Sequence, residues 1–568
     1  MGVSAAVFES AGKRTEHYVP GVYSRSNNVT SPSSVSSGNL CILGSSIGGK
    51  PLSLLEFGDI SEAKNSLVSG ELLEGVGLAF SGSNEYIPQK VFAMRVNGGT
   101  QASLDIVSGG SNVMKLTAWD YGTHTNQLKI KIEAGTEEKS KKVTVSYKDN
   151  SVVVDNIVKK SLKVSSSKTD ATVTVDKTSM TLVYTEEEES KSVVLLFSDF
   201  PKLSELAERI NTETGFIATL TDSDETALSS DLDFVQSKSL ATETVLYSNR
   251  KAFAEAVMGI EYIGSVELGE VRSVPENMAY TYFTGGSSDS AIVSDWVSAL
   301  EKLEVEDIQI ISTTSTDSNV HALIASHCSQ MGTTVNRKER TCILGGALGM
   351  SDEDAITAAV GFNNKLVSFV VDNPVINNPF TGEKETVSGA KLAVMLAGME
   401  SAMSVNMPLT NKSLNVLGFS KKRTISTMEK LIKGGVIVCN PSPDEPTNYV
   451  CIRGITTYQS ADLINNERSM VRENLFMNRD LRKKFSSGIG GINGNGIVSK
   501  VLATLNDTAK EWADLGYIIP NGNKNVWNTK IKVDGDKIYL TYSRYLTAPT
   551  NFIFITATNH VYTSTVEL

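Results

Sequence analysis

Long apolar runs are missing from the sequence. A membrane-spanning helix needs about 20 consecutive apolar residues, whereas the most apolar segments here, 192–197 and 392–399, are only long enough for core elements. The first nine residues have no basic flank before an apolar stretch, and Ala6 stands where a myristoylation signal requires serine or threonine. We therefore expect neither direct membrane insertion nor a targeting segment.

Cysteine and histidine are both scarce, at five residues each in 568. No histidine lies near a glycine-flanked serine or a reactive cysteine, as nucleophilic catalysis requires. His321 and His327 share one predicted helix with Cys328, but a step of six residues turns the two rings to different faces. We therefore expect no enzyme activity, no metal site and no cofactor. The cysteines lie far apart, mostly in apolar runs, which predicts buried thiols in a reducing compartment: Cys41, Cys328, Cys342, Cys439 and Cys451.

Positive charge is in deficit, with 53 lysines and arginines against 64 acidic residues and a net charge of −11 at pH 7. Such a chain repels polyanions, which argues against nucleic acid as a partner. With 40% hydrophobic residues and enough length for several cores, the chain has the composition of a multidomain globular protein.

The periodicity of apolar residues predicts an α/β (α+β) multidomain fold. Buried strands alternate with helical patterns at 40–44, 91–96, 308–312, 341–344 and 365–371. Between them, strict alternation predicts antiparallel strands with one wet face at 128–132, 143–147 and 171–175.

Changes in this pattern divide the chain into six predicted parts. They are an N-terminal arm (1–35), the first part of an α/β core (36–112), an inserted β-rich domain (113–240), an α/β domain (241–450), a C-terminal domain (451–546) and a C-terminal arm (547–568). Near the end of the chain, strands at 530–533 and 537–542 are joined at Asp534-Gly535, a strong hairpin signal, and 551–556 reads as a third strand.

Two glycine-rich segments follow predicted strands. Gly44-Ser45-Ser46-Ile47-Gly48-Gly49-Lys50 has the spacing of a phosphate-binding loop, but Pro51 replaces the hydroxyl residue that would hold Mg²⁺ and lacks a backbone N–H. The segment 345–349 lacks the spacing of a dinucleotide fingerprint. We interpret both as tight turns. The alternative is a soluble α/β enzyme that binds a nucleotide or phosphate with 44–50.

A charged helix is predicted at about 466–485. It is either an ordinary solvated face or a basic surface for an acidic protein partner. Six of its residues are basic: Arg468, Arg472, Arg479, Arg482, Lys483 and Lys484.

Both ends of the chain carry isolated apolar residues. An unpaired apolar strand at 552–556 aggregates unless another sheet accepts it, so we expect it to join a neighbouring subunit. Two such arms link subunits into an open lattice rather than a closed dimer. The expected arm residues are Val22, Tyr23, Phe552, Ile553, Phe554, Ile555 and Thr556.

Several segments, taken in order and spacing, resemble the contractile tail sheath proteins of bacteriophages and related injection machines. Each motif is degenerate by itself, and 388–398 departs from the family pattern by lacking a proline before its glycine. The segments are 20–23, 40–44, 91–96, 114–122 with Asn126, 388–398, 406–411 and 453–457.

This resemblance implies a structural protein that needs no nucleotide. Subunits are expected to form six-membered rings stacked around a tail tube, linked by their arms, and to contract so that the tube crosses the host envelope for genome delivery. The implied partners are the tail tube, baseplate and tail terminator proteins. The implied location is the virion tail, after assembly in the host bacterial cytoplasm. The six basic residues of 468–484 are expected to face the tube, and the β-rich insertion to decorate the outside.

Overall fold

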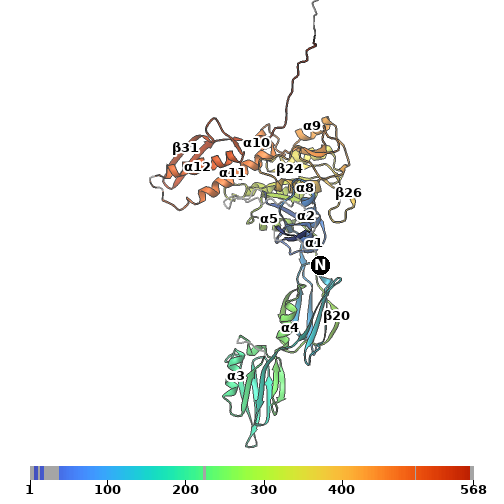
Figure 1. Ribbon diagram of the computed structural model, residues 1–568, viewed down its shortest axis with the longest axis vertical. Helices are drawn as coiled ribbons and strands as arrows, with labels where there is room; N and C mark the ends of the chain where they lie inside the picture. The colour runs from blue at the N-terminus through green and yellow to red at the C-terminus, as the bar shows by residue number, and fades with distance from the viewer. Residues whose placement is uncertain are drawn as a thin grey trace, which may run out of the picture. The chain divides into compact units, whose positions relative to one another are not determined.

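A computed structural model describes most of the chain, in two compact units (Figure 1). Unit 1 comprises 1–37 and 474–546, and unit 2 comprises 38–473 and 547–568. The described residues are 6–10, 13–17, 38–221, 226–492, 494 and 496–562. Among these residues, no helix is long and apolar enough to cross a membrane.

Unit 2 is built on an eight-stranded, mainly parallel sheet. Its strand order is β29-β28-β24-β23-β22-β3-β5-β4, with antiparallel pairs only at the two edges. The expected α/β fold is therefore confirmed. The strands are β3 (Leu40–Gly44), β4 (Leu54–Phe57), β5 (Val91–Arg95), β22 (Ile310–Thr313), β23 (Thr341–Gly345), β24 (Val367–Val370), β28 (Val436–Pro441) and β29 (Tyr449–Arg453).

Helices cover both faces of this sheet. Ile343 of β23 packs in one core with the helix α8, whereas its neighbour Cys342 faces Cys328 of α6 on the opposite side. The helices are α1 (Ile60–Leu67), α2 (Glu71–Ser81), α5 (Val293–Leu303), α6 (Ser318–Met331), α7 (Asp352–Phe362), α8 (Gly389–Ala402), α9 (Ile425–Lys433) and α10 (Leu463–Asn466). A further helix, α11 (Arg468–Ser486), begins in unit 2 and continues into unit 1.

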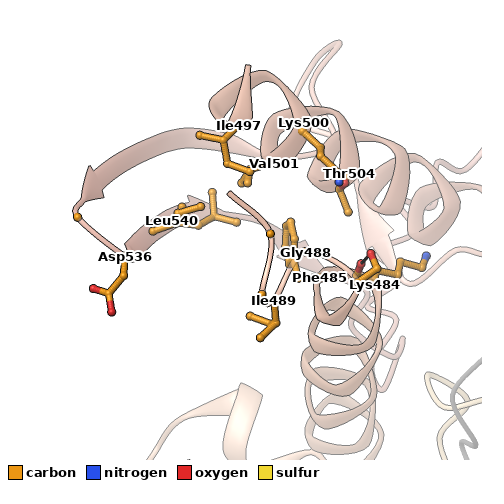
Figure 2. A pocket seen from close by; sticks show the side chains of 15 residues that line it. Lys484, Phe485, Gly488, Ile489, Ile497, Lys500, Val501, Thr504, Asp536 and Leu540 are labelled. Carbon is orange, nitrogen blue, oxygen red and sulfur yellow. Dashed lines mark hydrogen bonds between the residues drawn. The ribbon is translucent and has the colours of Figure 1, made fainter. Parts of the chain in front are cut away.

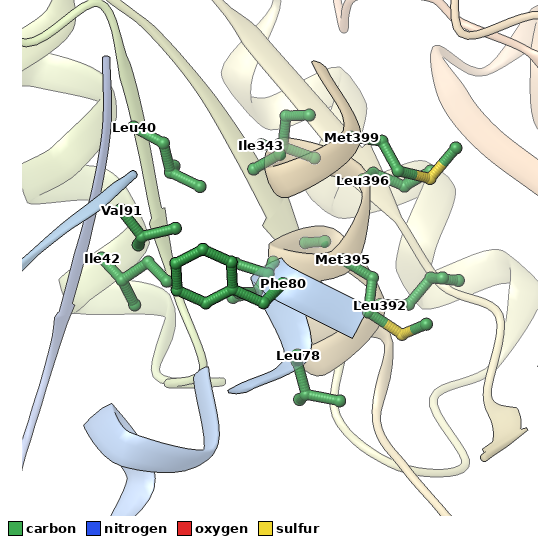
Figure 3. Close-up of a cluster of buried hydrophobic side chains, with 14 of the residues drawn as sticks. Leu40, Ile42, Leu78, Phe80, Val91, Ile343, Leu392, Met395, Leu396 and Met399 are labelled. Carbon is green, nitrogen blue, oxygen red and sulfur yellow. The ribbon is translucent and has the colours of Figure 1, made fainter. Parts of the chain in front are cut away.

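Helix α8 is the centre of the main core, and its residues Gly389 to Glu400 are almost all buried. It packs against α2, β22 and β23, and Figure 3 shows its side chains in one core with those of α2, β3 and β5. A Cβ on Gly398 would lie 2.2 Å from the carbonyl oxygen of Ala79 on α2. Helices α8 and α2 can therefore approach this closely only because residue 398 is a glycine, which has no side chain.

Antiparallel strands fill the chain between β5 and β22 and form two further cores. The first core uses β7 (Ser103–Ser108), β8 (Ser111–Ala118), β9 (Lys129–Ala134), β10 (Lys141–Tyr147), β11 (Asn150–Ile157), β19 (Ile263–Leu268), β20 (Met278–Tyr282) and α4 (Asn249–Met258). The second uses β12 (Lys160–Ser166), β13 (Thr169–Val175), β14 (Ser179–Glu186), β15 (Glu189–Leu196), β16 (Phe216–Leu220), β17 (Val235–Ser239), β18 (Thr244–Tyr247) and α3 (Leu203–Asn211). Two 3-10 turns, Thr123–Gln127 and Ser229–Asp231, lie in the same part of the chain.

The alternation in the sequence thus predicts these strands correctly, and they extend to both sides of 113–240. The domain boundaries stay predictions.

Short strands complete unit 2: β6 (Gly99–Thr100) with β21 (Ser287–Ser288), and β25 (Pro374–Asn377) with β26 (Lys384–Thr386) and β27 (Gly418–Phe419).

Unit 1 combines the end of α11 with a second helix and a hairpin. Trp512 is buried and its indole N–H donates to Asp480 on α11 at 2.9 Å. The predicted hairpin is confirmed, since Asp534 pairs with Lys537 and Gly535 adopts a positive φ of 61°. The elements are β1 (Ala6–Ser10), β2 (Lys13–His17), α12 (Ile497–Asp514), β30 (Ile518–Ile519), β31 (Trp527–Asp534), β32 (Lys537–Ser543) and β33 (Tyr545–Leu546).

We predict that Gly398→Ala destabilises unit 2 by about 1–3 kcal/mol, because the added methyl group must displace the backbone of α2. The matched control is Gly361→Ala, since Gly361 also lies in a helix and has no atom within 4 Å of the added Cβ. This control is expected to be neutral or slightly stabilising. Urea unfolding measures both changes, and equal stability of the two variants would contradict the close-packing argument.

Candidate assembly surfaces

Four backbone N–H groups of the glycine-rich loop at 44–51, those of residues 46–49, are already bonded within the protein. Ser46 N donates to Asn97 Oδ1 at 3.0 Å, and Gly49 N donates to the carboxylate of Asp120 at 3.1 Å. The N–H groups of Ile47 and Gly48 donate to carbonyl oxygens of 67–69 at 2.9 Å. A phosphate-binding loop needs these donors to converge on its ligand.

The carbonyl groups of the same loop bind one buried arginine. Arg95 Nη1 donates to the oxygens of Ile47 and Gly49 at 3.0 and 2.9 Å, and Arg95 is 0% exposed. These hydrogen bonds hold the loop against Arg95 and thus against β5 of unit 2. The interpretation of 44–50 as a tight turn is therefore supported, and the phosphate-binding alternative is not.

The other glycine segment and the histidines also have structural partners. A Cβ on Gly345 would lie 2.1 Å from the oxygen of Gly389, so 345–349 is a close approach between β23 and α8. His321 Nε2 lies 2.8 Å from the oxygen of Ser315, and His327 Nε2 lies 2.7 Å from Arg340 Nη1. The two rings therefore face different partners, as their spacing predicts.

Two of the six predicted basic residues do not lie on the surface, which corrects the expectation that they face a tube. Arg468 is 1% exposed and makes a bidentate pair with Glu400, with both N–O distances at 2.7 Å. Arg472 is 5% exposed and donates to the backbone oxygen of Glu400 at 2.9 Å. Burial favours the neutral form of Glu400, but the two arginines outweigh it and lower its pKa.

The other four basic residues, Arg479, Arg482, Lys483 and Lys484, lie on the part of α11 that belongs to unit 1. Lys483 is exposed, and Lys484 forms ion pairs with Asp480 and Glu511. Their role at a tube stays a prediction.

The C-terminal segment is attached to unit 2 at Asn551 and Phe552. The amide of Asn551 donates to Glu467 Oε2 at 3.2 Å, and the guanidinium of Arg453 lies over the Phe552 ring at 5.6 Å. Beyond this anchor, Ile553, Phe554 and Ile555 are 79%, 92% and 87% exposed.

No strand is formed at 547–562, so the strand predicted at 551–556 is absent from the single chain. A strand requires a hydrogen-bonded neighbour, and this segment has none within the described part of unit 2. The rings of Phe552 and Phe554 stack with centroids 6.4 Å apart, as alternate residues of an extended backbone do. Thr556 lies in the same segment, whereas Val22 and Tyr23 lie outside the described residues.

An apolar groove is open in unit 1. Its volume is about 790 Å³, and Figure 2 shows residues of α12 and of the hairpin facing the same opening. The β31–β32 hairpin beside it is a two-stranded sheet in the described residues, and isolated two-stranded sheets are marginally stable in water. Apolar side chains in the lining include Phe485, Ile489, Ile497, Val501, Ile538 and Leu540.

Four residues of these surfaces are not identified as site residues by the sequence: Glu400, Arg453, Glu467 and Asn551. Glu400 pairs with Arg468, 68 positions away, and Glu467 with Asn551, 84 positions away, while Arg453 lies over Phe552, 99 positions away. Only the folded chain brings them together.

No protein-family model matches the chain. The tail sheath protein of Bacillus phage SP01 is 24% identical over 585 residues, which cover 96% of this chain and 95% of that protein. The tail sheath protein of Staphylococcus phage Twort is 22% identical over 481 residues, covering 78% and 80%. The crystal structure of a sheath tail protein from Desulfitobacterium hafniense has the same fold, with a TM-score of 0.55, 13% identity, and coverage of 93% of this chain and all of that one.

The described surfaces comprise an internally bonded loop at 44–51 and an exposed apolar segment at 553–555. The relatives are phage tail sheath proteins, and they support the phage contractile tail sheath family for this chain. The resemblance noted in the sequence is thereby confirmed.

We predict that Glu400→Gln destabilises the protein by about 3–5 kcal/mol, because it removes the buried carboxylate that pairs with Arg468 and lies beside Arg472. Glu353→Gln is the control, since Glu353 forms a solvent-exposed ion pair with Lys430, and such pairs contribute little to stability. Chemical denaturation compares the two variants. A loss at Glu400 no larger than that at Glu353 would refute the argument.

We further predict a pH-dependent stability from Glu467. Burial raises its pKa to about 7, while Asn551 and Arg453 lower it only in part. Because this folded-state pKa exceeds the ordinary value of 4.5, protonated Glu467 contributes to the free energy of unfolding. This contribution is fully present below about pH 4.5 and is lost as the pH rises through 7. The loss is at most about 3 kcal/mol.

The measurement is the difference in unfolding free energy between wild type and Glu467→Gln at several values of pH. Relative to the variant, wild type is expected to lose stability from pH 5 to 8, because glutamine stays neutral throughout. Parallel profiles would exclude Glu467 as the titrating group.

Proposed function

We propose that this chain is the structural subunit of a phage contractile tail sheath, which polymerises around the tail tube and contracts to drive the tube through the host envelope for genome delivery. The observation that carries the proposal is similarity to a tail sheath protein over 96% of the chain. The internally bonded loop at 44–51 gives the enzyme alternative no support.

The C-terminal arm is the proposed link between subunits. Its exposed residues Ile553, Phe554 and Ile555 present apolar side chains on both sides of an extended backbone. Strand addition to the β31–β32 hairpin of a second copy would satisfy its backbone and bury these side chains. The groove beside that hairpin supports this choice of acceptor. On this proposal Val22 and Tyr23 act as the corresponding N-terminal arm.

The finer arrangement follows from the same proposal. Subunits form hexameric rings that stack into a helical sheath, and the exposed basic part of α11, with Lys483, faces the tail tube. The sheath meets the baseplate at one end and the tail terminator protein at the other. It is a virion component that assembles in the host bacterial cytoplasm.

Contraction requires no nucleotide on this proposal. An extended lattice that is metastable can release free energy when the faces of many subunits repack cooperatively. Arms that stay bound during this change keep the lattice connected.

We predict that Phe554→Asp abolishes tube formation without changing stability, because the side chain is 92% exposed in the single chain and would be buried by strand addition. Negative-stain microscopy of the purified chain is expected to find hollow tubes for wild type and dispersed particles for the variant. Deletion of 547–568 is expected to give the same result.

Val335→Asp is the matched control, since Val335 is 82% exposed and lies outside the arm. It is expected to form tubes like wild type, and the two aspartate variants are expected to share the melting temperature of wild type. Tubes formed by the Phe554→Asp and deletion variants would show that the arm is not the linker.

A further inference from the structure

Two of the five buried thiols lie opposite each other on neighbouring strands. Cys439 belongs to β28 and Cys451 to β29, and the antiparallel register pairs them directly. A register shift precedes Cys439, after which residues 439–441 pair with 449–451 without interruption. Both side chains are 0% exposed, and both thiols are free in this structure.

The backbone hydrogen bonds show which kind of pair this is. Cys439 N donates to Asp372 Oδ2 at 2.7 Å, and Cys451 N donates to the oxygen of Lys412 at 3.2 Å. The oxygen of Cys451 accepts from Asn411 N at 2.7 Å. The two cysteines therefore do not exchange hydrogen bonds. In such pairs the Cα atoms are about 4.5 Å apart, which is within the range of about 4.4–6.8 Å that a disulfide spans.

We propose that Cys439 and Cys451 are a latent disulfide site, which oxidises to a cross-strand bond when the protein meets peroxide outside a reducing compartment. One sulfur attacks hydrogen peroxide, forming an S–O bond as the O–O bond breaks, and water leaves. The second sulfur then attacks the sulfenic acid, forming the S–S bond and releasing a second water. Two thiols and one peroxide give one disulfide and two waters.

Burial of the two thiols slows this oxidation but does not prevent it. Burial and the neighbouring thiol raise the pKa of Cys439 well above its ordinary value, so little thiolate is present in the closed fold. However, β29 is an edge strand of the eight-stranded sheet, and its outer side is hydrogen-bonded to the short segment 411–414. Local separation of an edge strand needs less free energy than global unfolding.

The bond would fasten the strand that anchors the C-terminal arm. Arg453, which lies over Phe552, is two residues beyond Cys451 on β29. A disulfide between Cys439 and Cys451 ties this strand to β28 and closes the chain between them into a small loop. It therefore constrains the unfolded chain and opposes fraying at the anchor.

The remaining cysteines provide an internal comparison. Cys328 and Cys342 also interact, but they join helix α6 to the interior strand β23, which has β22 on one side and β24 on the other. Cys41 lies on the interior strand β3. These three residues are expected to remain thiols while the edge pair oxidises.

The test is mass spectrometry of the folded, full-length protein after incubation with dilute hydrogen peroxide. The protein is then denatured, alkylated with iodoacetamide and digested with trypsin. Both cysteines fall in one tryptic peptide, 434–453, which contains no methionine. We expect this peptide to be two hydrogen atoms lighter and unalkylated, with the other three cysteines alkylated. Double alkylation of 434–453, or a disulfide among the other three residues instead, would overturn the proposal.

A thermal measurement gives a second readout. Peroxide is expected to raise the melting temperature of wild type and of Cys41→Ala, but not of Cys451→Ala. If Cys451→Ala fails to fold, the comparison of oxidised and reduced wild type by mass still decides. An equal rise in all three proteins would assign the effect to another site.

Discussion

The buried guanidinium of Arg468 holds unit 2 together at the point where its helices and sheet meet. It pairs with Glu400 on α8 and donates to the oxygen of Cys342 on β23 and to Ser368 on β24. Two charges removed from water are tolerated only when both are fully hydrogen-bonded. This requirement fixes the start of α11 relative to α8 and the sheet.

The polar groups of the loop at 44–51 are likewise hydrogen-bonded within unit 2. Asp120 accepts from the N–H of Gly49, and Arg95 donates to two carbonyl oxygens of the loop. The loop is therefore bonded to the sheet and to the segment after β8 rather than presenting these groups to a ligand. The apolar side chains of 553–555, by contrast, are 79–92% exposed among the described residues, which suits a segment that binds a partner.

The edge strand β29 contacts both the buried core of unit 2 and the C-terminal segment. Strand β29 carries Cys451 towards β28 and Arg453 towards the C-terminal segment, while Glu467 binds Asn551 beside it. Protonation of Glu467, or a bond between Cys439 and Cys451, would therefore affect the contacts of Asn551 and Phe552 at this edge. Asn551 and Phe552 thus contact unit 2 through this strand and the residue next to α11.

The sequence by itself determined the strands of the main sheet, the alternating insertion and the hairpin at Asp534-Gly535, because these follow from local periodicity and turn chemistry. It also identified the apolar end at 552–556. It could not tell a solvated arginine from a buried one, and it placed Arg468 on a surface. The burial of Arg468, the closure of the loop by Asp120 and the facing of Cys439 and Cys451 were decided only by the tertiary structure. Desolvation and pairing depend on residues far apart in the chain, which no local pattern records.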